Sequence, residues 1–337
     1  MLKKKKMDLA ADALAKSIVE GMEASAAAAT MGEKWIPEGA TEPVHIEESA
    51  EAEVAPTLTR WEQFWSIFKH NKLALVSLII ILLMFILCYG ASIFAPYDPT
   101  AQDLSQSLKG PSWEHWLGTD KFGRDVLSRI LYGGRISLAI GLLPTTLFMI
   151  IGTTLGLISG FIGGKVDSII MRIADVCMAF PSLVLAMVLT YTFGAGIFSV
   201  FLALAVVGWA GTARVVRSEV LSLREKEYVE AATSIGVKRA VIMIRHILPN
   251  CVPTLIVLLT TNIPGSILTE SSLSFLGIGA QPPMTSWGLM VYQMKPYLSL
   301  NPVATLAPGV VILLLVVAFN FLGDALRDKL DPKLQEQ

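Results

Sequence analysis

Five long stretches of the chain carry no Asp, Glu, Lys or Arg, and they limit what it can fold into more than any other feature. The stretches lie between residues 72 and 98, 135 and 165, 175 and 214, 246 and 270, and 295 and 324. A membrane-spanning helix needs about 20 mainly apolar residues, so four stretches fit one span each. The stretch between residues 175 and 214 is long enough for two, and Gly194-Ala195-Gly196 divides it. The sequence therefore predicts six spans, at residues 73–95, 136–160, 168–193, 197–218, 252–275 and 303–323.

The composition also indicates an all-α, polytopic membrane protein. Of the 337 residues, 53% are hydrophobic and 16% are charged, whereas soluble domains carry about 25% charged residues. The difference points to a large surface that faces lipid. The three cysteines and four histidines have no disulfide or metal-site spacing, so we expect no metal or cofactor on this chain.

The distribution of basic residues predicts the orientation. Six spans place both termini on one side, and Lys and Arg outside the first 56 residues divide 15 to 6 between the two sides. Cytoplasmic loops collect positive charge, so both termini are expected in the cytoplasm. Residues 1–56 hold 6 Lys/Arg and 11 Asp/Glu with few aromatic residues, which is typical of a disordered tail.

We expect five parts along the chain. They are a cytoplasmic tail (1–56), an N-terminal module with the first span (57–99), an extracytoplasmic loop (100–135), a transmembrane core (136–325) and a cytoplasmic C-terminal tail (326–337). Within the loop, residues 120–132 alternate charged and apolar residues at helical spacing, which predicts a short helix at the outer membrane surface.

Two features of the spans predict how their helices pack. Arg172 and Asp175 are three residues apart near the cytoplasmic end of the third span, so we expect them to pair, and Pro181 is expected to kink that helix. In the second span, glycines recur every four residues on one face, where a neighbouring helix can approach closely. These glycines are Gly152, Gly156 and Gly160.

The longest cytoplasmic loop, residues 219–250, reads as two short surface helices joined by a bend. Gly236 ends the first helix in the position that glycine favours. In the second helix Val241, Ile244 and Leu248 share an apolar face, and Pro249 predicts a sharp turn into the fifth span.

The first of these helices carries two small residues beside an acidic one. Ala231 and Ala232 allow its backbone to lie deep in a partner's groove, where Glu230 can pair with an arginine. An amphipathic helix that lies on the membrane surface without a partner fits the same residues equally well.

This loop resembles the EAA loop of ABC import permeases. The residues that carry the resemblance are Glu230-Ala231-Ala232, Gly236, His246 and Leu248-Pro249. The wider family usually has Ile at the position of His246, and the sequence around it looks like the dipeptide, oligopeptide and nickel branch. Further motifs of that branch are Leu117-Gly118-Thr119-Asp120, Gly123-Arg124-Asp125, Phe180-Pro181, Glu270-Ser271-Ser272 and Asp331-Pro332, so the resemblance covers about residues 60–333.

The resemblance implies the type I importer fold, with six transmembrane helices and a cytoplasmic EAA coupling loop. It implies the C-type permease subunit of a di- or oligopeptide importer in a bacterial or archaeal inner membrane. The expected partners are a second homologous permease, two cytoplasmic ATPases and an extracytoplasmic substrate-binding protein. ATP and Mg²⁺ would bind to the ATPases, and this chain would be a transport subunit rather than an enzyme.

The resemblance also suggests roles for particular residues. Glu230, Ala232 and Gly236 are expected to couple the chain to the ATPases. Glu270, at the outer end of the fifth span, either shapes an outer gate or is solvated at the interface. The loop of residues 276–302, with Pro282-Pro283, is expected to fold back over the pore mouth and meet the binding protein.

Three other functions compete with this assignment. A secondary transporter working alone needs ionisable groups at mid-membrane, and only the pair near the inner end of span three and Glu270 qualify. A membrane-embedded enzyme needs a polar catalytic constellation, and none stands out. A nickel or other small-solute importer of the same branch stays open, because the permease need not encode selectivity when a binding protein delivers the cargo.

Overall fold

The structure is a computed structural model that describes residues 71–330. The expected tail of residues 1–56, most of the N-terminal module before the first span and the last seven residues lie outside the described part. Residues 71–330 form helices and connecting loops with no β-sheet, so the prediction of an all-α fold is confirmed. The helices are α3 (Lys72–Tyr89), α4 (Ala91–Phe94), η1 (Leu104–Gln106), α5 (Val126–Ile162), α6 (Gly164–Met178), α7 (Ser182–Phe193), α8 (Ile197–Leu223), α9 (Glu227–Ser234), α10 (Arg239–Ile242), the π-helical turn η2 (Met243–Ile247), α11 (Leu248–Phe275), α12 (Trp287–Met294), η3 (Lys295–Tyr297) and α13 (Pro302–Leu330).

The long apolar helices match the charge-free stretches of the sequence. Five described helical segments are long and apolar enough to cross a membrane, and the α6–α7 pair makes a sixth if a bent pair counts as one span. The axes of α6 and α7 differ by 88°. Pro181 has an extended backbone at this break, and a proline disfavours helical geometry in the residue before it. The predicted kink is therefore a complete break.

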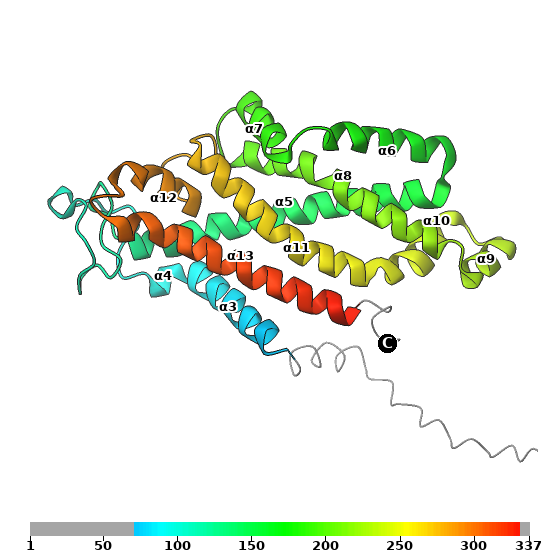
Figure 1. The fold of residues 1–337 in the computed structure, drawn as a ribbon, viewed down its shortest axis with the longest axis horizontal. Helices are drawn as coiled ribbons and strands as arrows, with labels where there is room; N and C mark the ends of the chain where they lie inside the picture. The colour runs from blue at the N-terminus through cyan, green and yellow to red at the C-terminus, as the bar shows by residue number, and fades with distance from the viewer. Residues whose placement is uncertain (1–70, 331–337) are drawn as a thin grey trace, which may run out of the picture. The chain divides into compact units, whose positions relative to one another are not determined.

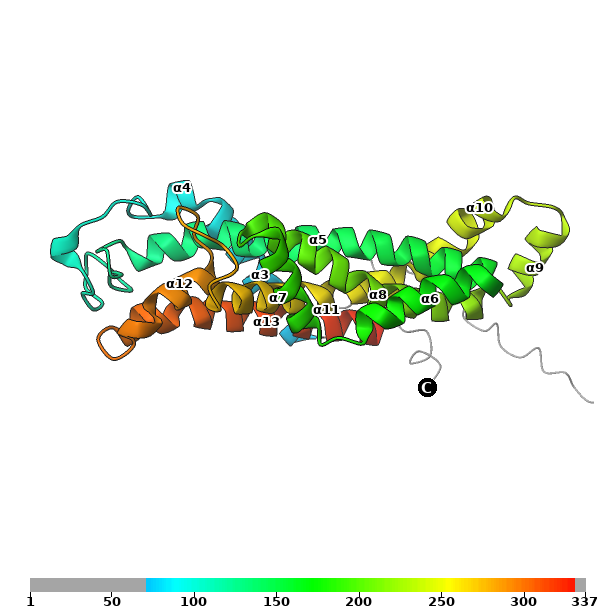
Figure 2. The ribbon, with the colours of Figure 1, turned by 90° about the horizontal axis from the view of Figure 1, so that it is seen from above.

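The long helices pack side by side in one bundle (Figures 1 and 2). α5 makes its most extensive contact with α8, and α11 packs against both α5 and α13, while α3 lies on α13. The two figures place α9 and α10 at one end of the bundle, and α4, α12 and the loop before α5 at the other. We call these the α9 end and the α12 end.

One helix boundary differs strongly from the prediction. α5 begins at Val126 rather than at residue 136, so the separate surface helix expected over residues 120–132 is wrong. The Asp125 carboxylate accepts a hydrogen bond from the Ser128 backbone N–H at 2.7 Å and caps the first turn of α5. Arg129 in that turn is buried. The helical periodicity of residues 120–132 predicts a surface helix and therefore does not reveal this burial.

Candidate functional site

The loop between α8 and α11 forms the predicted pair of short helices. α9 ends in a left-handed turn at Gly236, whose φ is +80°. The Gly236 N–H donates to the Thr233 carbonyl at 3.0 Å, and the Val237 N–H donates to the Ala232 carbonyl at 3.1 Å. Both bonds together make a Schellman motif, which satisfies the last carbonyls of α9 and requires positive φ at Gly236.

The two faces of α9 have different surroundings. Ala232 and Val229 are buried, and Ala232 is only 6% exposed. Glu230 and Ala231 are exposed on the opposite face. Ala232 packs inside its own chain, so Ala231 is the one of the two alanines that lies on the exposed face of α9, and docking of this helix in a partner's groove stays a prediction. The buried cluster around Ala232 comprises Leu157, Val216, Val220, Val229, Ala232, Ile242, Ile247 and Cys251.

The second short helix has a different apolar face from the predicted one. Ile244 is 63% exposed, and Ile242 and Ile247 are buried instead. The cause is the π-helical turn, in which the Leu248 N–H donates to the Met243 carbonyl five residues earlier. In a π-helix, residues five apart lie on one face, and Ile242 and Ile247 have this spacing.

The sharp turn expected at Pro249 is also absent. The helix continues from α10 through the π-helical turn into α11, with Pro249 in the first turn of α11. A proline is tolerated in a first turn, where its fixed φ suits the helix and its missing N–H costs little. His246 is half-buried, and its carbonyl accepts a hydrogen bond from Asn250 Nδ2 at 2.6 Å. The connection to the membrane helix is therefore continuous.

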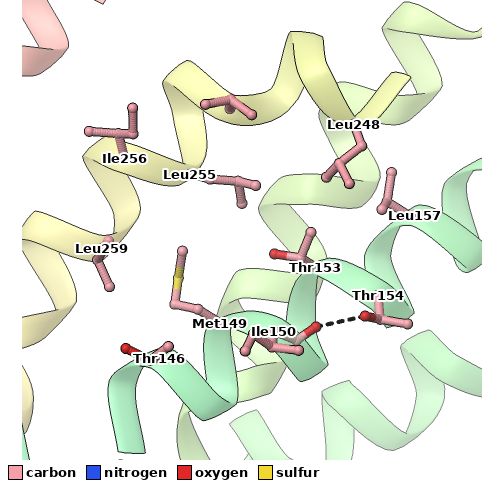
Figure 3. A pocket seen from close by; sticks show the side chains of 11 residues that line it. Thr146, Met149, Ile150, Thr153, Thr154, Leu157, Leu248, Leu255, Ile256 and Leu259 are labelled. Atoms are coloured by element: carbon pink, nitrogen blue, oxygen red, sulfur yellow. Dashed lines mark hydrogen bonds between the residues drawn. The ribbon is translucent and has the colours of Figure 1, made fainter. Parts of the chain in front are cut away.

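A groove between α5 and α11 begins beside this loop (Figure 3). Its volume is about 410 Å³. The lining is apolar apart from three threonines, and one of these, Thr154, donates its hydroxyl to the Ile150 carbonyl at 2.8 Å. The lining residues are Thr146, Met149, Ile150, Thr153, Thr154, Leu157, Leu248, Val252, Leu255, Ile256 and Leu259.

Two residues connect the groove with the loop. Leu157 belongs both to the groove lining and to the cluster that holds Ala232, and Leu248 follows the π-helical turn and also lines the groove. A chain of packed side chains therefore leads from α9 through Ile242 and Ile247 to the groove. A displacement of α9 can reach the groove through direct contacts.

The glycine face of α5 lies against α8. A Cβ on Gly152 would stand 2.7 Å from the Trp209 carbonyl oxygen, and one on Gly156 would stand 2.7 Å from that of Ala213. A Cβ on Gly160 would meet the Val220 side chain at 2.8 Å. All three positions therefore lack room for a side chain, as close helix packing at small residues requires.

Glu270 is fully buried in α11, so a solvated position at the interface is wrong. Its Oε1 accepts a hydrogen bond from the Ser274 hydroxyl at 2.7 Å. The Ser274 Oγ in turn accepts the Ala280 N–H at 3.0 Å and the Ser286 hydroxyl at 3.4 Å. The carboxyl group thus ties α11 to the segment that leads into α12, at the α12 end of the bundle.

The segment after α11 packs back against α5, and the expected contact of residues 276–302 with a binding protein stays a prediction. Trp287 at the start of α12 is completely buried. Its indole Nε1 donates to the Ile130 carbonyl at 2.9 Å, and its backbone N–H donates to Ser137 Oγ at 3.1 Å. Gln293 Oε1 accepts a hydrogen bond from Arg129 Nη2 at 3.1 Å. α12 is therefore fixed to the first three turns of α5.

The motif before α5 is a buried charge cluster, which sequence reasoning missed. Asp120 Oδ2 pairs with Arg124 at 2.7 Å and also with Arg129, and Asp120 itself is 2% exposed. Nearby on the same loop, hydrogen bonds from Ser105 lower the pKa of the exposed Asp103. Helical periodicity does not reveal the partners of Asp120. The two arginines within nine residues of this carboxylate were a usable signal for an ion pair.

The predicted pair of Arg172 and Asp175 is wrong. Asp175 instead pairs with Arg214 of α8 at 2.5 Å, and both side chains are about half exposed. A second bridge joins the same two helices, where Asp167 accepts hydrogen bonds from Arg217 Nε at 2.5 Å and Nη2 at 2.6 Å. An arginine on a neighbouring helix reaches these carboxylates better than one on their own helix, and sequence spacing does not show it.

Comparison with known proteins gives the family. Residues 152–336 match the model described as the binding-protein-dependent transport system inner membrane component. The chain belongs to this family. Residues 59–111 match a second model, the N-terminal TM domain of oligopeptide transport permease C. The resemblance read from the loop and its companion motifs is therefore confirmed, and the chain is a multi-pass permease subunit of the inner membrane.

Curated relatives resemble the permease over most of its length. It is 43% identical over 278 residues to a glutathione transport system permease protein, GsiD, of Pectobacterium atrosepticum, which covers 82% of this chain and 92% of the relative. It is 40% identical over 280 residues to the oligopeptide transport system permease protein OppC of Bacillus subtilis, covering 83% and 92%. The dipeptide transport system permease protein DppC of Alkalihalophilus pseudofirmus is 42% identical over 275 residues, covering 82% and 90%.

Proposed function

We propose that this permease subunit imports di- or oligopeptides together with a second permease, two cytoplasmic ATPases and an extracytoplasmic binding protein. The observation that carries the coupling mechanism is the continuous packing from α9 to the groove between α5 and α11. The names of the relatives, which refer to oligopeptides, dipeptides and glutathione, support a peptide as substrate.

The exposed face of α9 is the proposed contact with an ATPase. Glu230 and Ala231 lie on it, so a carboxylate stands beside a residue small enough for close backbone approach. Ala232 acts from the opposite face by anchoring α9 in its own chain. Both termini then lie in the cytoplasm, on the side of α9, and Glu270 and α12 lie at the outer end.

In the proposed cycle, ATP bound by the ATPases draws them together, and they move α9 with them. Ile242, Ile247 and Leu248 transmit this displacement to the wall of the groove. The permease changes between inward- and outward-facing states because the closed ATPases bind one state more tightly than the other. Glu270 and its serine partners hold the α12 segment as part of the outer gate.

The test is a Gly236→Val variant studied in the complete assembly. A valine cannot adopt φ near +80° without strain, so the Schellman turn will change and the exposed face of α9 will be displaced. We expect insertion and subunit assembly to persist, while peptide uptake and binding-protein-stimulated ATP hydrolysis fall to background. Gly164→Val is the matched control, because Gly164 also has positive φ and open space around its Cβ but lies away from α9.

The measurement is uptake of labelled dipeptide, tripeptide and glutathione into membrane vesicles, with labelled nickel tested in parallel. Normal peptide uptake by Gly236→Val would refute the coupling role of this turn. Uptake of nickel without any peptide would replace the proposed substrate class and leave the permease assignment in place.

A further inference from the structure

The connection from α10 to α11 contains the one π-helical segment within residues 71–330. In this segment, η2, the Leu248 N–H donates to the Met243 carbonyl, whereas an α-helix would use the carbonyl of Ile244, four residues earlier. π-helical turns are rare, and they occur mostly as single turns inside α-helices and often at functional sites. η2 lies between the loop that holds α9 and the membrane helix α11. Its geometry therefore determines which face of α10 is buried.

The sequence through η2 carries two apolar faces that compete for burial. The observed face contains Ile242 and Ile247, which are five residues apart and fully buried. The other face follows α-helical spacing without a break from the start of α10 into α11, at alternating intervals of four and three residues. Its members, which we call the α row, are Val237, Val241, Ile244, Leu248, Cys251 and Leu255.

Ile244 is the exception within the α row, because it is 63% exposed. Val241 is half-buried, and the other four members belong to the cluster that holds Ala232 or pack against it. In Figure 3, Leu248 and Leu255 point from α11 towards α5. A regular α-helix would bring Ile244 onto the same face as these two residues. The π-helical turn is therefore what keeps Ile244 out of the cluster.

Pro249 reduces the advantage that an α-helix would otherwise have at η2. A regular α-helix would need an N–H at residue 249 for the Arg245 carbonyl, and proline has none. The Asn250 side chain donates to the next carbonyl, that of His246, at 2.6 Å, so this group has a donor outside the backbone. The π-helical turn gives up fewer hydrogen bonds here than it would in an ordinary helix. Side-chain packing then determines which of the two faces is buried.

Conversion of η2 to a regular α-helix would move α9. Each α-helical residue corresponds to a rotation of about 100° and a rise of about 1.5 Å. Removing the extra residue from the turn rotates α10 by this angle against α11, which takes Ile242 out of the cluster and brings Ile244 in. At a helix radius of about 2.3 Å the backbone moves through about 4 Å. α9 shares the cluster through Val229 and Ala232, so it follows this displacement.

We propose that η2 is a two-position switch in the transport cycle. Ile242 is buried when η2 is π-helical, Ile244 is buried when η2 is α-helical, and the ATPases convert one arrangement into the other. Both arrangements place an isoleucine in the same cluster, as a switch between two discrete packed states requires. The inference rests on the proposed multi-subunit importer and adds the conformational step between α9 and the groove.

The experiment is site-specific photocrosslinking in the complete assembly in native membranes. An aliphatic amino acid that carries a diazirine and is close to isoleucine in size replaces Ile242 in one variant and Ile244 in the other. Crosslinked peptides are identified by mass spectrometry, first without nucleotide and then with ATP bound to hydrolysis-deficient ATPases. The targets are Val216 and Val220, the α8 residues of the cluster. We expect the ratio of the two crosslinking yields to change at least about tenfold between the conditions, and an unchanged ratio overturns the switch.

Substitutions of Ile244 test the switch through transport. Because this side chain is exposed, Ile244→Ser should leave the melting temperature of the chain and the co-purification of the ATPases unchanged. Peptide uptake should fall at least about tenfold, because serine cannot take the apolar place of Ile244 in the α row. Ile244→Val keeps an apolar side chain and should retain uptake.

The same variant separates the switch from a simple contact between Ile244 and an ATPase. With Ile244→Ser, crosslinking from position 242 to α8 should no longer respond to ATP, whereas loss of a surface contact would leave this response in place. Normal uptake by Ile244→Ser, or a full ATP response at position 242 in that variant, overturns the inference.

Other outcomes separate the two proposals. An unchanged crosslinking ratio, while the ATPases and a second permease co-purify and peptide uptake continues, overturns the switch and leaves the proposed function standing. If neither an ATPase nor a second permease co-purifies with the unmodified chain, both are overturned.

Discussion

Replacing Gly156 by alanine tests whether the glycine face of α5 sets the distance between α5 and α8. A Cβ at this position would lie 2.7 Å from the Ala213 carbonyl oxygen, 2.8 Å from Val216 Cβ and 3.1 Å from the Arg217 backbone nitrogen. Two of these three atoms belong to the backbone, so a rotamer change cannot remove the conflict. The two helices must move apart.

The size of the effect follows from that displacement. Ordinary contact at 3.4 Å requires the Cβ and the carbonyl oxygen to separate by about 0.7 Å, the difference between 3.4 and 2.7 Å. Inserting a methyl group into a well-packed site costs about 1–3 kcal/mol. One kcal/mol shifts the Tm of a domain of this size by roughly 2–4 °C, so a fall of about 2–12 °C is expected.

The assay is a thermal-unfolding measurement on the full-length chain in detergent, compared with Gly211→Ala. Gly211 lies in α8, yet a Cβ there would meet nothing within 4 Å. This control should keep or slightly raise Tm, because alanine is favoured over glycine inside a helix by about 0.5–1 kcal/mol. Equal Tm values for the two variants would refute the claim that the glycine face sets the distance between α5 and α8.

The remaining predictions concern the α12 end. Glu270→Leu should destabilise the chain by about 1–3 kcal/mol because the Ser274 hydroxyl loses its buried acceptor. Glu270→Gln keeps an acceptor and should retain most of the stability. Equal losses of stability for the two variants in thermal melts would contradict this. Asp120→Ala should cost about 3–5 kcal/mol because Arg129 is then a buried cation without a carboxylate. Asp103→Ala, on the exposed part of the same loop, should leave the melting temperature almost unchanged, and a similar loss there would show that any loop change has this effect.

For the coupling loop, the sequence pattern predicted one feature correctly and did not reveal two others. The left-handed turn at Gly236 was predictable because a helix followed by glycine has few other endings. The burial of Ala232 was not predictable, since an alanine fits either a groove in a partner or a tight site in its own chain. The π-helical turn shifted the buried face to Ile242 and Ile247 because helical periodicity assumes 3.6 residues per turn throughout.

The sequence alone determined the membrane class, the positions of the apolar segments, the presence of a bend at Pro181, the small-residue face of α5 and the family. Each of these follows from local composition or from a short ordered motif, and the requirement that lipid-facing helices be apolar leaves few alternatives. Tertiary structure decided which charges pair. Asp175 pairs with Arg214 rather than with Arg172, Asp120 pairs with two arginines, and Glu270 is buried among serines. A charged side chain binds whatever helix packing brings within reach, and that arrangement is set by contacts distant in sequence.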